Sequence, residues 1–363
     1  MAAKQGRVPL QDIGLDLLRT MPLRSYTPSS SKDDYGKLLI IGGSARLPGA
    51  ALLSARAALR SGCGTVRVAA PRSVASLLAL QVPELMAVPL PETEEGTASE
   101  AAYNVLERQF APCDAVVLGP GLDDSPEVRA LCLRVLAECP LPMVVDATAL
   151  VAIGAQEENQ PELGVGRAPR VFTPHDAEMA GLCGGMVPQE RVMYARLDFA
   201  SEWAHSHDAT LVLKGQRTLI ADAKGATFRN LAGTRGMGTA GSGDVLAGII
   251  GSFLAQRMNP LRSAVWGVHA HALAGERAAA QRGDDGMMAS DFLEELPYVL
   301  REFREKMGEQ LNRRGAEAQR RGRGVKKRGG EVHSPCYPPT KSSLPLRAST
   351  TLGKAKSRLR ECR

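Results

Sequence analysis

Residues 236–248 read GMGTAGSGDVLAG, a glycine-rich loop that runs directly into an apolar segment. Glycines let the backbone take positive φ and approach a ligand with no Cβ in the way. The apolar segment from Val245 to Leu254 has a helical pattern, and the unpaired N–H groups at a helix start carry a partial positive charge. A glycine loop that leads into a helix start therefore predicts an anion-binding site.

Asp244 is the single carboxylate in this stretch and stands where the helix is expected to begin. An Asp at or next to the N-cap is favoured for structural reasons alone. The density of glycines, the hydroxyls of Thr239 and Ser242, and the absence of Lys and Arg from 236–248 favour a ligand site instead. We interpret Asp244 as a carboxylate placed beside a bound phosphate.

Two common nucleotide motifs are excluded. Gly236 to Gly241 formally match G-x-G-x-x-G, but the polar run at 229–235 precedes them, whereas a dinucleotide fingerprint follows a buried strand directly. The phosphate-loop pattern G-x-x-x-x-G-K-[ST] occurs nowhere in the chain. The predicted anion site therefore belongs to neither of these folds.

The charge of the chain is unevenly distributed. Of its 363 residues 44% are apolar and 4% aromatic, and the formal net charge is +6. Residues 310–363 hold 15 Lys or Arg and 3 Glu, a net of +12, which leaves −6 on residues 1–309. We expect an N-terminal arm at 1–34, one catalytic domain at 35–309, and a basic disordered tail at 310–363. A solvated tail is favoured over one that contacts nucleic acid, for which charge is the sole argument.

Cysteines and apolar runs indicate the compartment. Seven cysteines are scattered without C-x-x-C spacing, as in a protein with free thiols in a reducing compartment. The N-terminus leads into no apolar signal region, and no apolar run reaches 18 residues. These features predict a cytoplasmic protein with no membrane segment.

Apolar strands alternate with helical segments along most of the chain, which predicts an α/β fold with a mostly parallel central sheet covered by helices on both faces. Residues 151–170 are expected to be irregular, and a helix is expected to start at 174–179. The expected strands are 37–41, 65–70, 86–90, 115–118, 143–145, 170–173 and 210–213, with a hairpin of 218–221 and 226–228, and the expected helices are 12–18, 50–60, 74–80, 98–109, 127–138, 191–205, 245–254, 264–282 and 291–305.

Several of the expected strands end in glycine or in a polar residue. Right-handed crossovers place the carboxyl ends of parallel strands at one edge of the sheet, where ligands of open α/β sheets bind. Residues 42–44 (GGS), residues 119–121 (GPG) and Asp146 all follow such strands. This edge is the predicted ligand site.

Together with the glycine loop, Leu213-Lys214-Gly215, Thr173-Pro174-His175 and residues 118–121 (LGPG) carry a resemblance. The chain resembles the ADP-dependent (S)-NAD(P)H-hydrate dehydratases, a branch of the ribokinase-like superfamily, over roughly residues 20–305. The order and spacing of the motifs carry the resemblance. Further motifs that match the family are residues 42–51, 145–147, Glu178 and Asn230.

The resemblance implies a repair enzyme, a hydro-lyase. It would remove water from the (6S)-hydrate of NADH or NADPH, with ADP as phosphoryl donor and Mg²⁺ as metal cofactor, and release AMP, phosphate and the restored cofactor. The nicotinamide dinucleotide is then a substrate. The resemblance also implies a homo-oligomer, most often a tetramer.

Phosphoryl transfer to the C6 hydroxyl would turn a poor leaving group into a good one, and it needs an acceptor for the hydroxyl proton. Asp244 is the expected acceptor and the expected catalytic residue, and the Mg²⁺ ligands stay unassigned. By resemblance, ADP would contact Lys214, Gly215, Gln216, Arg217, Thr218, Ala240, Gly241, Ser242 and Gly243, and the hydrate would contact Gly49, Ala50, Ala51, Gly119, Gly121, His175 and Asp244.

Each candidate residue also has a structural interpretation. His175 can cap the helix that it precedes, Lys214 can be a surface lysine, Gly119 to Gly121 can be a plain turn, and Asp146 can cap the next segment. His269 and His271 are two residues apart, so they do not share a helix face, and a core or interface role is favoured over a metal site.

Two other functions fit the same motifs. A small-molecule kinase of the same superfamily, acting on a vitamin precursor or sugar alcohol, would share the glycine loop and the Asp but leave a stable phosphate ester. A non-catalytic nucleotide-binding protein would keep its function with Asn in place of Asp244. Ser242 stands where the resembling family commonly has Thr, a change that keeps the hydroxyl.

Overall fold

The computed structural model describes residues 10–156, 168–184 and 187–306. All of these belong to the compact unit of residues 1–310. The predicted tail at 310–363 and the first nine residues of the predicted arm lie outside the described residues. Among the helices that are described, none combines the length and the hydropathy needed to cross a membrane.

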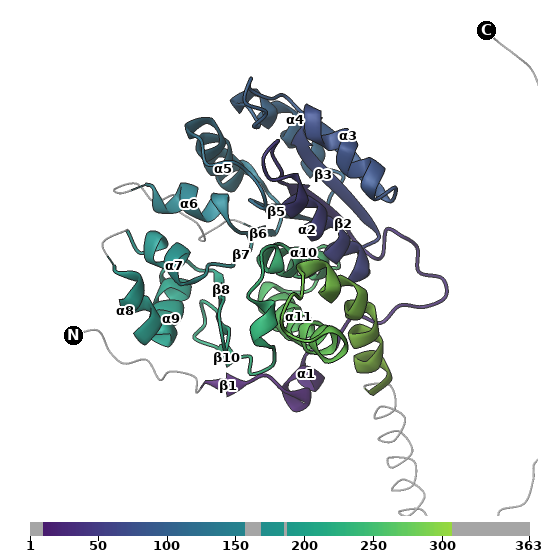
Figure 1. The fold of residues 1–363 in the computed structure, drawn as a ribbon, viewed down its shortest axis with the longest axis vertical. Coiled ribbons are helices and arrows are strands. Elements are labelled where there is room, and N and C mark those ends of the chain that lie inside the picture. The colour runs from purple at the N-terminus through teal and green to yellow at the C-terminus, as the bar shows by residue number, and fades with distance from the viewer. Residues whose placement is uncertain (1–9, 157–167, 185–186, 307–363) are drawn as a thin grey trace, which may run out of the picture. The chain divides into compact units, whose positions relative to one another are not determined.

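The described strands form one ten-stranded sheet in the order β1-β10-β9-β8-β7-β6-β5-β2-β3-β4 (Figure 1). Its pairs are parallel except at β9, which runs antiparallel to β8 and β10 and gives the predicted hairpin. The strands are β1 (Gln11–Asp12), β2 (Lys37–Ile41), β3 (Thr65–Pro71), β4 (Leu85–Leu90), β5 (Ala115–Leu118), β6 (Met143–Val145), β7 (Arg170–Phe172), β8 (Thr210–Leu213), β9 (Leu219–Ala221) and β10 (Thr227–Arg229).

Helices connect most of the strands, as the sequence predicts. They are α1 (Leu15–Thr20), α2 (Pro48–Arg60), α3 (Arg72–Gln81), α4 (Tyr103–Phe110), α5 (Pro126–Glu138), α6 (Thr148–Gly154), α7 (Asp176–Leu182), α8 (Gln189–Tyr194), α9 (Arg196–Ser206), α10 (Ser242–Ala255) and α11 (Pro260–Arg282), with 3₁₀ turns η1 (Glu100–Ala102) and η2 (Arg235–Met237). A further helix covers 289–306.

Side chains alternate between two buried cores, one on each face of the sheet. On β2, Leu38 and Ile40 join a core with α2, α3, α10, α11 and the helix at 289–306. Leu39 and Ile41 point the other way, into a core with α4, α5, α6, α7 and α9. Because successive side chains of a strand face opposite sides, both faces must be covered. The predicted α/β fold is confirmed.

Helices α10 and α11 begin three and four residues earlier than predicted, and four further predicted elements differ in the structure. The helix predicted at 12–18 begins at Leu15, since β1 pairs with β10 and its Asp12 binds the Arg229 guanidinium. The helix predicted at 98–109 begins later, because Ala98 pairs with Glu92 in a β-bridge. The predicted irregular segment at 151–170 starts with the end of α6 and ends with the first residue of β7, and its residues 157–167 lie outside the described residues.

The fourth is the helix predicted at 191–205, which is split in two at Ala195. Its φ of −120° and ψ of 32° are not helical. The break lets Arg196 start a new helix, α9, with its guanidinium on Asp176 and on the carbonyl of Leu213. The break therefore allows Arg196 to contact two distant segments, and local helix propensity does not predict such contacts.

Helix α10 is buried along nearly its whole length, packed between α2, α11 and the sheet. A Cβ on Gly248 would lie 2.1 Å from the carbonyl oxygen of Ser54 in α2, and one on Gly251 would lie 2.3 Å from Val117 of β5. The Ser54 hydroxyl donates to the carbonyl oxygen of Asp244 at 2.8 Å. Glycine thus sets how closely α10 approaches its neighbours, which fixes the position of its N-terminus.

Replacing Gly248→Ala tests this constraint. The new methyl group would overlap a backbone oxygen that cannot rotate away, so we expect a loss of about 1–3 kcal/mol in the free energy of unfolding, as for overpacked cores, measured by urea denaturation. Gly181→Ala is the matched control, because a Cβ there meets nothing within 4 Å and Ala is the better helix former. Equal stability of the two variants would contradict the packing argument.

Candidate active site

The carboxyl ends of five parallel strands meet at one edge of the sheet. Strands β2, β5, β6, β7 and β8 are neighbours there, and the hydrogen bonding continues past their ends. The N–H of Asp146 donates to Leu118, and that of Thr173 donates to Val145. The residues that follow these strands are therefore held in register with one another, which places the predicted ligand edge on an ordered backbone.

The start of α10 lies against this edge. Its N-cap is Gly241, whose φ of 88° is in the left-handed region, and a Cβ there would lie 2.5 Å from Leu53. Asp244 is therefore the third residue of the helix and not its cap, because the helix begins at Ser242, three residues earlier than the sequence predicted. Gly243 carries no side chain, and its missing Cβ would lie 3.3 Å from Lys214 Nζ and 4.0 Å from Asp146 Oδ2.

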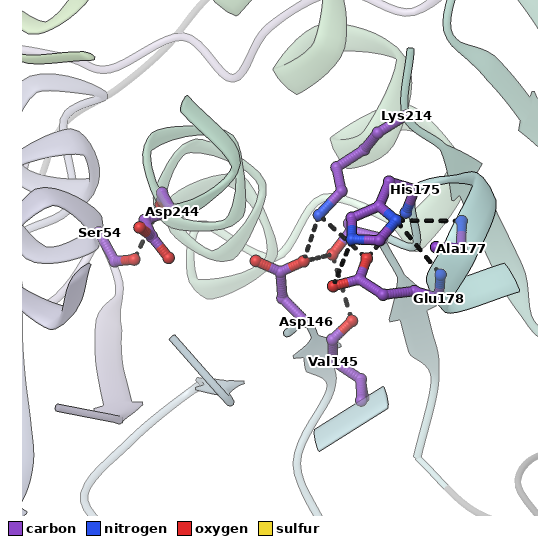
Figure 2. Close-up of polar contacts among 9 residues, drawn as sticks. Ser54, Val145, Asp146, His175, Ala177, Glu178, Lys214 and Asp244 are labelled. Atoms are coloured by element: carbon purple, nitrogen blue, oxygen red, sulfur yellow. Dashed lines mark hydrogen bonds and ion pairs between the residues drawn. The ribbon is translucent and has the colours of Figure 1, made fainter. Parts of the chain in front are cut away.

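Lys214 links the residues at the strand ends. Its Nζ is 2.8 Å from Asp146 Oδ1 and 3.6 Å from Glu178 Oε2. Its side chain is 18% exposed, so Lys214 is not the plain surface lysine of the alternative interpretation. Figure 2 shows Asp146, Lys214, Glu178 and His175 in one cluster, with the hydrogen bond from Ser54 holding the backbone of Asp244 to one side.

Asp146 is a buried carboxylate with two donors. Its side chain is 2% exposed, and Oδ1 accepts hydrogen bonds from the Lys214 ammonium and from the Thr173 hydroxyl at 2.8 Å each. It does not cap α6, whose N-cap is Ala147 without a side-chain cap. Ala147 has a φ of 49°, a region that L-residues other than Asn and Asp rarely adopt. The backbone is therefore strained at Ala147, directly after the carboxylate that Lys214 and Thr173 hold in place.

His175 is the N-cap of α7. Its Nδ1 accepts from the backbone N–H groups of Ala177 and Glu178 at 3.1 and 3.2 Å, and the backbone N–H of His175 donates to Glu178 Oε2 at 2.8 Å. The capping interpretation is confirmed. Because Nδ1 accepts, the neutral ring carries its hydrogen on Nε2. This nitrogen lies 3.4 Å from Glu178 Oε1, and the His175 side chain is 54% exposed. Capping leaves part of the ring accessible to a ligand.

The predicted nucleotide loop follows β8. Gly215 to Arg217 are exposed, and Lys214 and Thr218 are half-buried. Arg196 anchors the loop by donating to the carbonyls of Leu213 and Lys214 at 2.8 and 3.0 Å. Gly215 has a φ of 148°, and a Cβ there would lie 2.9 Å from the guanidinium of Arg196. Of the other residues that are predicted to bind ADP, Ala240 is exposed, and Gly241, Ser242 and Gly243 are half-buried.

The predicted hydrate-binding glycines also pack against their own chain. Gly119 and Gly121 are buried with φ of 123° and 71°, and Cβ atoms there would lie 1.8 Å from the carbonyl of Asp146 and 2.4 Å from that of Leu47. Their requirement for glycine therefore comes from loop packing. At the start of α2, Gly49 is exposed, Ala50 is half-buried and Ala51 is fully buried. Contact of these five residues with a substrate stays a prediction.

The pKa of Asp244 departs from its usual range. Burial, together with the negative charges of Asp146 and Glu178, raises the pKa of Asp244 to about 7, although the Lys214 ammonium opposes the shift. Burial acts to lower the pKa of Lys214, but the carboxylates of Asp146, Glu178 and Asp244 outweigh it and raise that pKa. At neutral pH the site thus holds a charged lysine and an Asp244 poised between its two forms.

Two histidines of α11 are buried, as predicted. His269 and His271 are 8% and 7% exposed. His269 Nδ1 is 2.9 Å from Asn230 Oδ1, and His271 Nε2 is 3.5 Å from Ser242 Oγ. Within the described ranges, no three His, Cys, Asp or Glu residues converge as a ready-made metal site.

A hollow of about 470 Å³ lies between α6 and α7, beside the cluster of Asp146, Lys214, Glu178 and His175. His175 and Glu178 face it on one side, and Leu150 and Val151 of α6 face it on the other. The hollow is large enough for part of a dinucleotide, since ligand pockets typically enclose roughly 300–1,000 Å³. It places His175 between an open space and the lysine network.

Sequence reasoning gave Asp146, Glu178 and Arg196 no role in the site. Asp146 carried a signal, because it follows a buried strand at the predicted ligand edge. Glu178 carried one too, because a Glu three residues after an N-cap is the capping-box pattern. Arg196 had none, since its role depends on the position of β8.

Comparisons with known proteins show which family the chain resembles. The family model described as NAD(P)H-hydrate dehydratase matches residues 38–298. The chain is 37% identical over 285 residues to the ADP-dependent (S)-NAD(P)H-hydrate dehydratase of Xanthomonas campestris, which covers 78% of this chain and 93% of that protein. It is 39% identical over 322 residues to a bifunctional NAD(P)H-hydrate repair enzyme of Moorella thermoacetica.

The match with the Moorella protein covers 84% of this chain and 60% of that protein. The chain thus spans little more than half the length of such bifunctional relatives. Among solved structures, the ADP/ATP-dependent NAD(P)H-hydrate dehydratase of Bacillus subtilis, co-crystallised with ATP and Mg²⁺, has a TM-score of 0.69 at 26% identity, and the match covers 81% of this chain and 99% of that one. The chain belongs to the NAD(P)H-hydrate dehydratase family.

Proposed function

We propose that this protein is an ADP-dependent dehydratase for the (6S)-hydrate of NADH or NADPH. The observation that carries the proposal is Asp244, a carboxylate with a pKa of about 7 in the first turn of α10. A general base works best when its pKa lies near the operating pH. The glycine-bounded helix start beside it offers N–H groups to a phosphoryl group, so base and anion site adjoin.

The reaction follows from these two parts. Asp244 accepts the proton of the C6 hydroxyl as that oxygen attacks the β-phosphorus of ADP, and the bond from phosphorus to the AMP oxygen breaks. The electron pair of the ring nitrogen then expels phosphate by breaking the C6–O bond. Loss of a proton from C5 restores the reduced ring. The products are AMP, phosphate and the cofactor, so one water has been removed and ADP has been cleaved.

Lys214 and its neighbours hold this arrangement. The Lys214 ammonium lies against Gly243, where it adds positive charge to the anion site. Magnesium would neutralise charge on the nucleotide phosphates when bound. The donor chemistry fits, because Asp146 Oδ2 points to the α10 start, and Mg²⁺ bound to phosphates commonly needs one or two carboxylates. Asp146 is the residue that would hold it, which leaves Asp244 free to accept the proton.

Cytoplasmic location and assembly as a homo-tetramer stay predictions. Exposed apolar side chains on α3 and on the edge strand β4, namely Leu77, Leu80 and Met86, are compatible with a contact between subunits. Sedimentation of the purified chain measures the assembly directly.

The central test is incubation of the protein with the (6S)-hydrate of NADH, ADP and Mg²⁺. We expect the absorbance of the reduced nicotinamide to return, with AMP and phosphate released in equal amounts. Asp244→Asn is expected to lower kcat by roughly 10²-fold or more, the range for loss of a general base, with little change in KM for ADP. Glu84→Gln, the same loss of one negative charge at an exposed position, is the control. A stable phosphate ester as product would identify a kinase instead.

The pH dependence of kcat tests the ionisation of Asp244. Because the base acts in its charged form, kcat is expected to rise with pH and to level off above about 7. Lys214→Gln removes the positive charge that lowers this pKa, so the midpoint is expected to move to higher pH. Lys224→Gln, at an exposed turn, removes the same charge and should leave the midpoint in place. A midpoint that does not respond to Lys214→Gln would contradict the electrostatic assignment.

The stability of Asp244→Asn gives an independent test. The pKa of Asp244 rises from 3.8 to about 7 on folding, so ionisation disfavours the folded state. That penalty is absent below about pH 4, grows as pH rises, and is complete above about 7. We expect Asp244→Asn to melt at a higher temperature than the wild type at pH 8, with the difference shrinking by pH 4. An Asn variant that is less stable at pH 8 would show that the carboxylate is not strained.

A further inference from the structure

Helices α10 and α11 bring Ser242 and His271 together behind the anion site. Ser242 is the first residue of α10, and its Oγ is 3.5 Å from Nε2 of His271. The His271 ring packs edge-on against Phe292, with ring centroids 5.4 Å apart, and the residue is 7% exposed. Packing therefore fixes the imidazole with one nitrogen directed at the serine hydroxyl, and the steps derived above leave this pair unused.

His271 is neutral at physiological pH. Burial lowers the pKa of His271 to about 4, and the positive charge of Lys214 acts in the same direction. A neutral imidazole has one nitrogen that donates and one that accepts. Two arrangements are then open: Nε2–H donates to the Ser242 oxygen, or Nε2 accepts the Ser242 hydroxyl hydrogen.

A bound phosphoryl group distinguishes these arrangements. Its ionised oxygens accept hydrogen bonds and donate none, so Ser242 helps to bind it only if its hydroxyl hydrogen is free. We propose that His271 is a positioning residue: its Nε2–H donates to Ser242 Oγ, which turns the serine hydroxyl hydrogen toward the phosphoryl group during transfer. The proposal rests on the proposed function and gives His271 a task that it performs through Ser242.

His269 supplies a matched comparison two residues earlier on α11. It is 8% exposed, and burial lowers its pKa to about 4 as well. Its ring nitrogen meets Asn230 at 2.9 Å instead of Ser242. A change at His269 thus disturbs the same helix and the same kind of buried imidazole without reaching the anion site.

The test is a double-mutant cycle on kcat with the hydrate of NADH, ADP and Mg²⁺. Ser242→Ala and His271→Leu are each expected to lower kcat roughly tenfold, the scale of one charge-assisted hydrogen bond, with KM for the hydrate nearly unchanged. The double variant should lose no more than the worse single one. His271→Gln, which keeps an N–H donor, should recover part of the loss, and Ser242→Thr should keep most of the activity.

His269→Leu is the control, and its effect should multiply with that of Ser242→Ala. The proposal is overturned if the losses from His271→Leu and Ser242→Ala also multiply, or if His271→Gln is as poor as His271→Leu. A wild-type protein that fails to restore the cofactor would overturn the proposed function itself, and this inference with it.

A spectroscopic measurement on the unaltered chain covers the case in which His271→Leu does not fold. The ¹⁵N shifts of the imidazole nitrogens report which one carries the hydrogen. With ADP and Mg²⁺ present, His271 is expected to be protonated on Nε2 alone. Protonation on Nδ1 alone would leave Nε2 as an acceptor and would refute the assignment.

Discussion

The structure of the site depends on the ion pair between Lys214 and Asp146. It joins the ends of β8 and β6, and it lies against α10 only because Gly243 has no Cβ to keep the ammonium away. A buried pair of this kind gains little net stability, since desolvation offsets most of the attraction. Its consequence is positional: a cation is held at the point where a helix start already favours an anion.

The same arrangement sets the ionisation of Asp244. Asp146, Glu178 and Asp244 place three carboxylates around one ammonium, so full ionisation would leave a local charge of −2 in a partly buried space. Lys214 and Thr173 both donate hydrogen bonds to the Asp146 carboxylate. Asp244 lacks such donors from neighbouring side chains among the described residues, and its pKa rises to about 7. Electrostatic strain thus falls on the carboxylate that can use it as a base.

How much the sequence predicted depended on how local each feature is. Strands β2 to β10, the sheet edge and the glycine loop follow from periodicity and from glycines, which are local, and these were predicted. Strand β1 was not predicted, because its two residues are recognised only by their pairing with β10. Asp146 follows a strand, but its partner Lys214 is 68 residues away, so the ion pair required the strand order. The break at Ala195 and the role of Arg196 likewise depend on β8. The Ala-rich faces of α2 and α11 pack on α10 within the chain. Composition alone does not predict which element such a face packs against.

Several glycines of the site are required by the fold itself. Cβ atoms at Gly119, Gly121 and Gly241 would collide with Asp146, Leu47 and Leu53, so the loops reach their positions through contacts within the chain. A site assembled in this way does not need its ligand to take shape. Since dipoles and charges that are already in place stabilise a transition state without reorganisation, the packing that selects glycine at these positions also prepares the anion site. Fold and chemistry therefore constrain the same residues, which explains why the motifs are short, separated and rich in glycine.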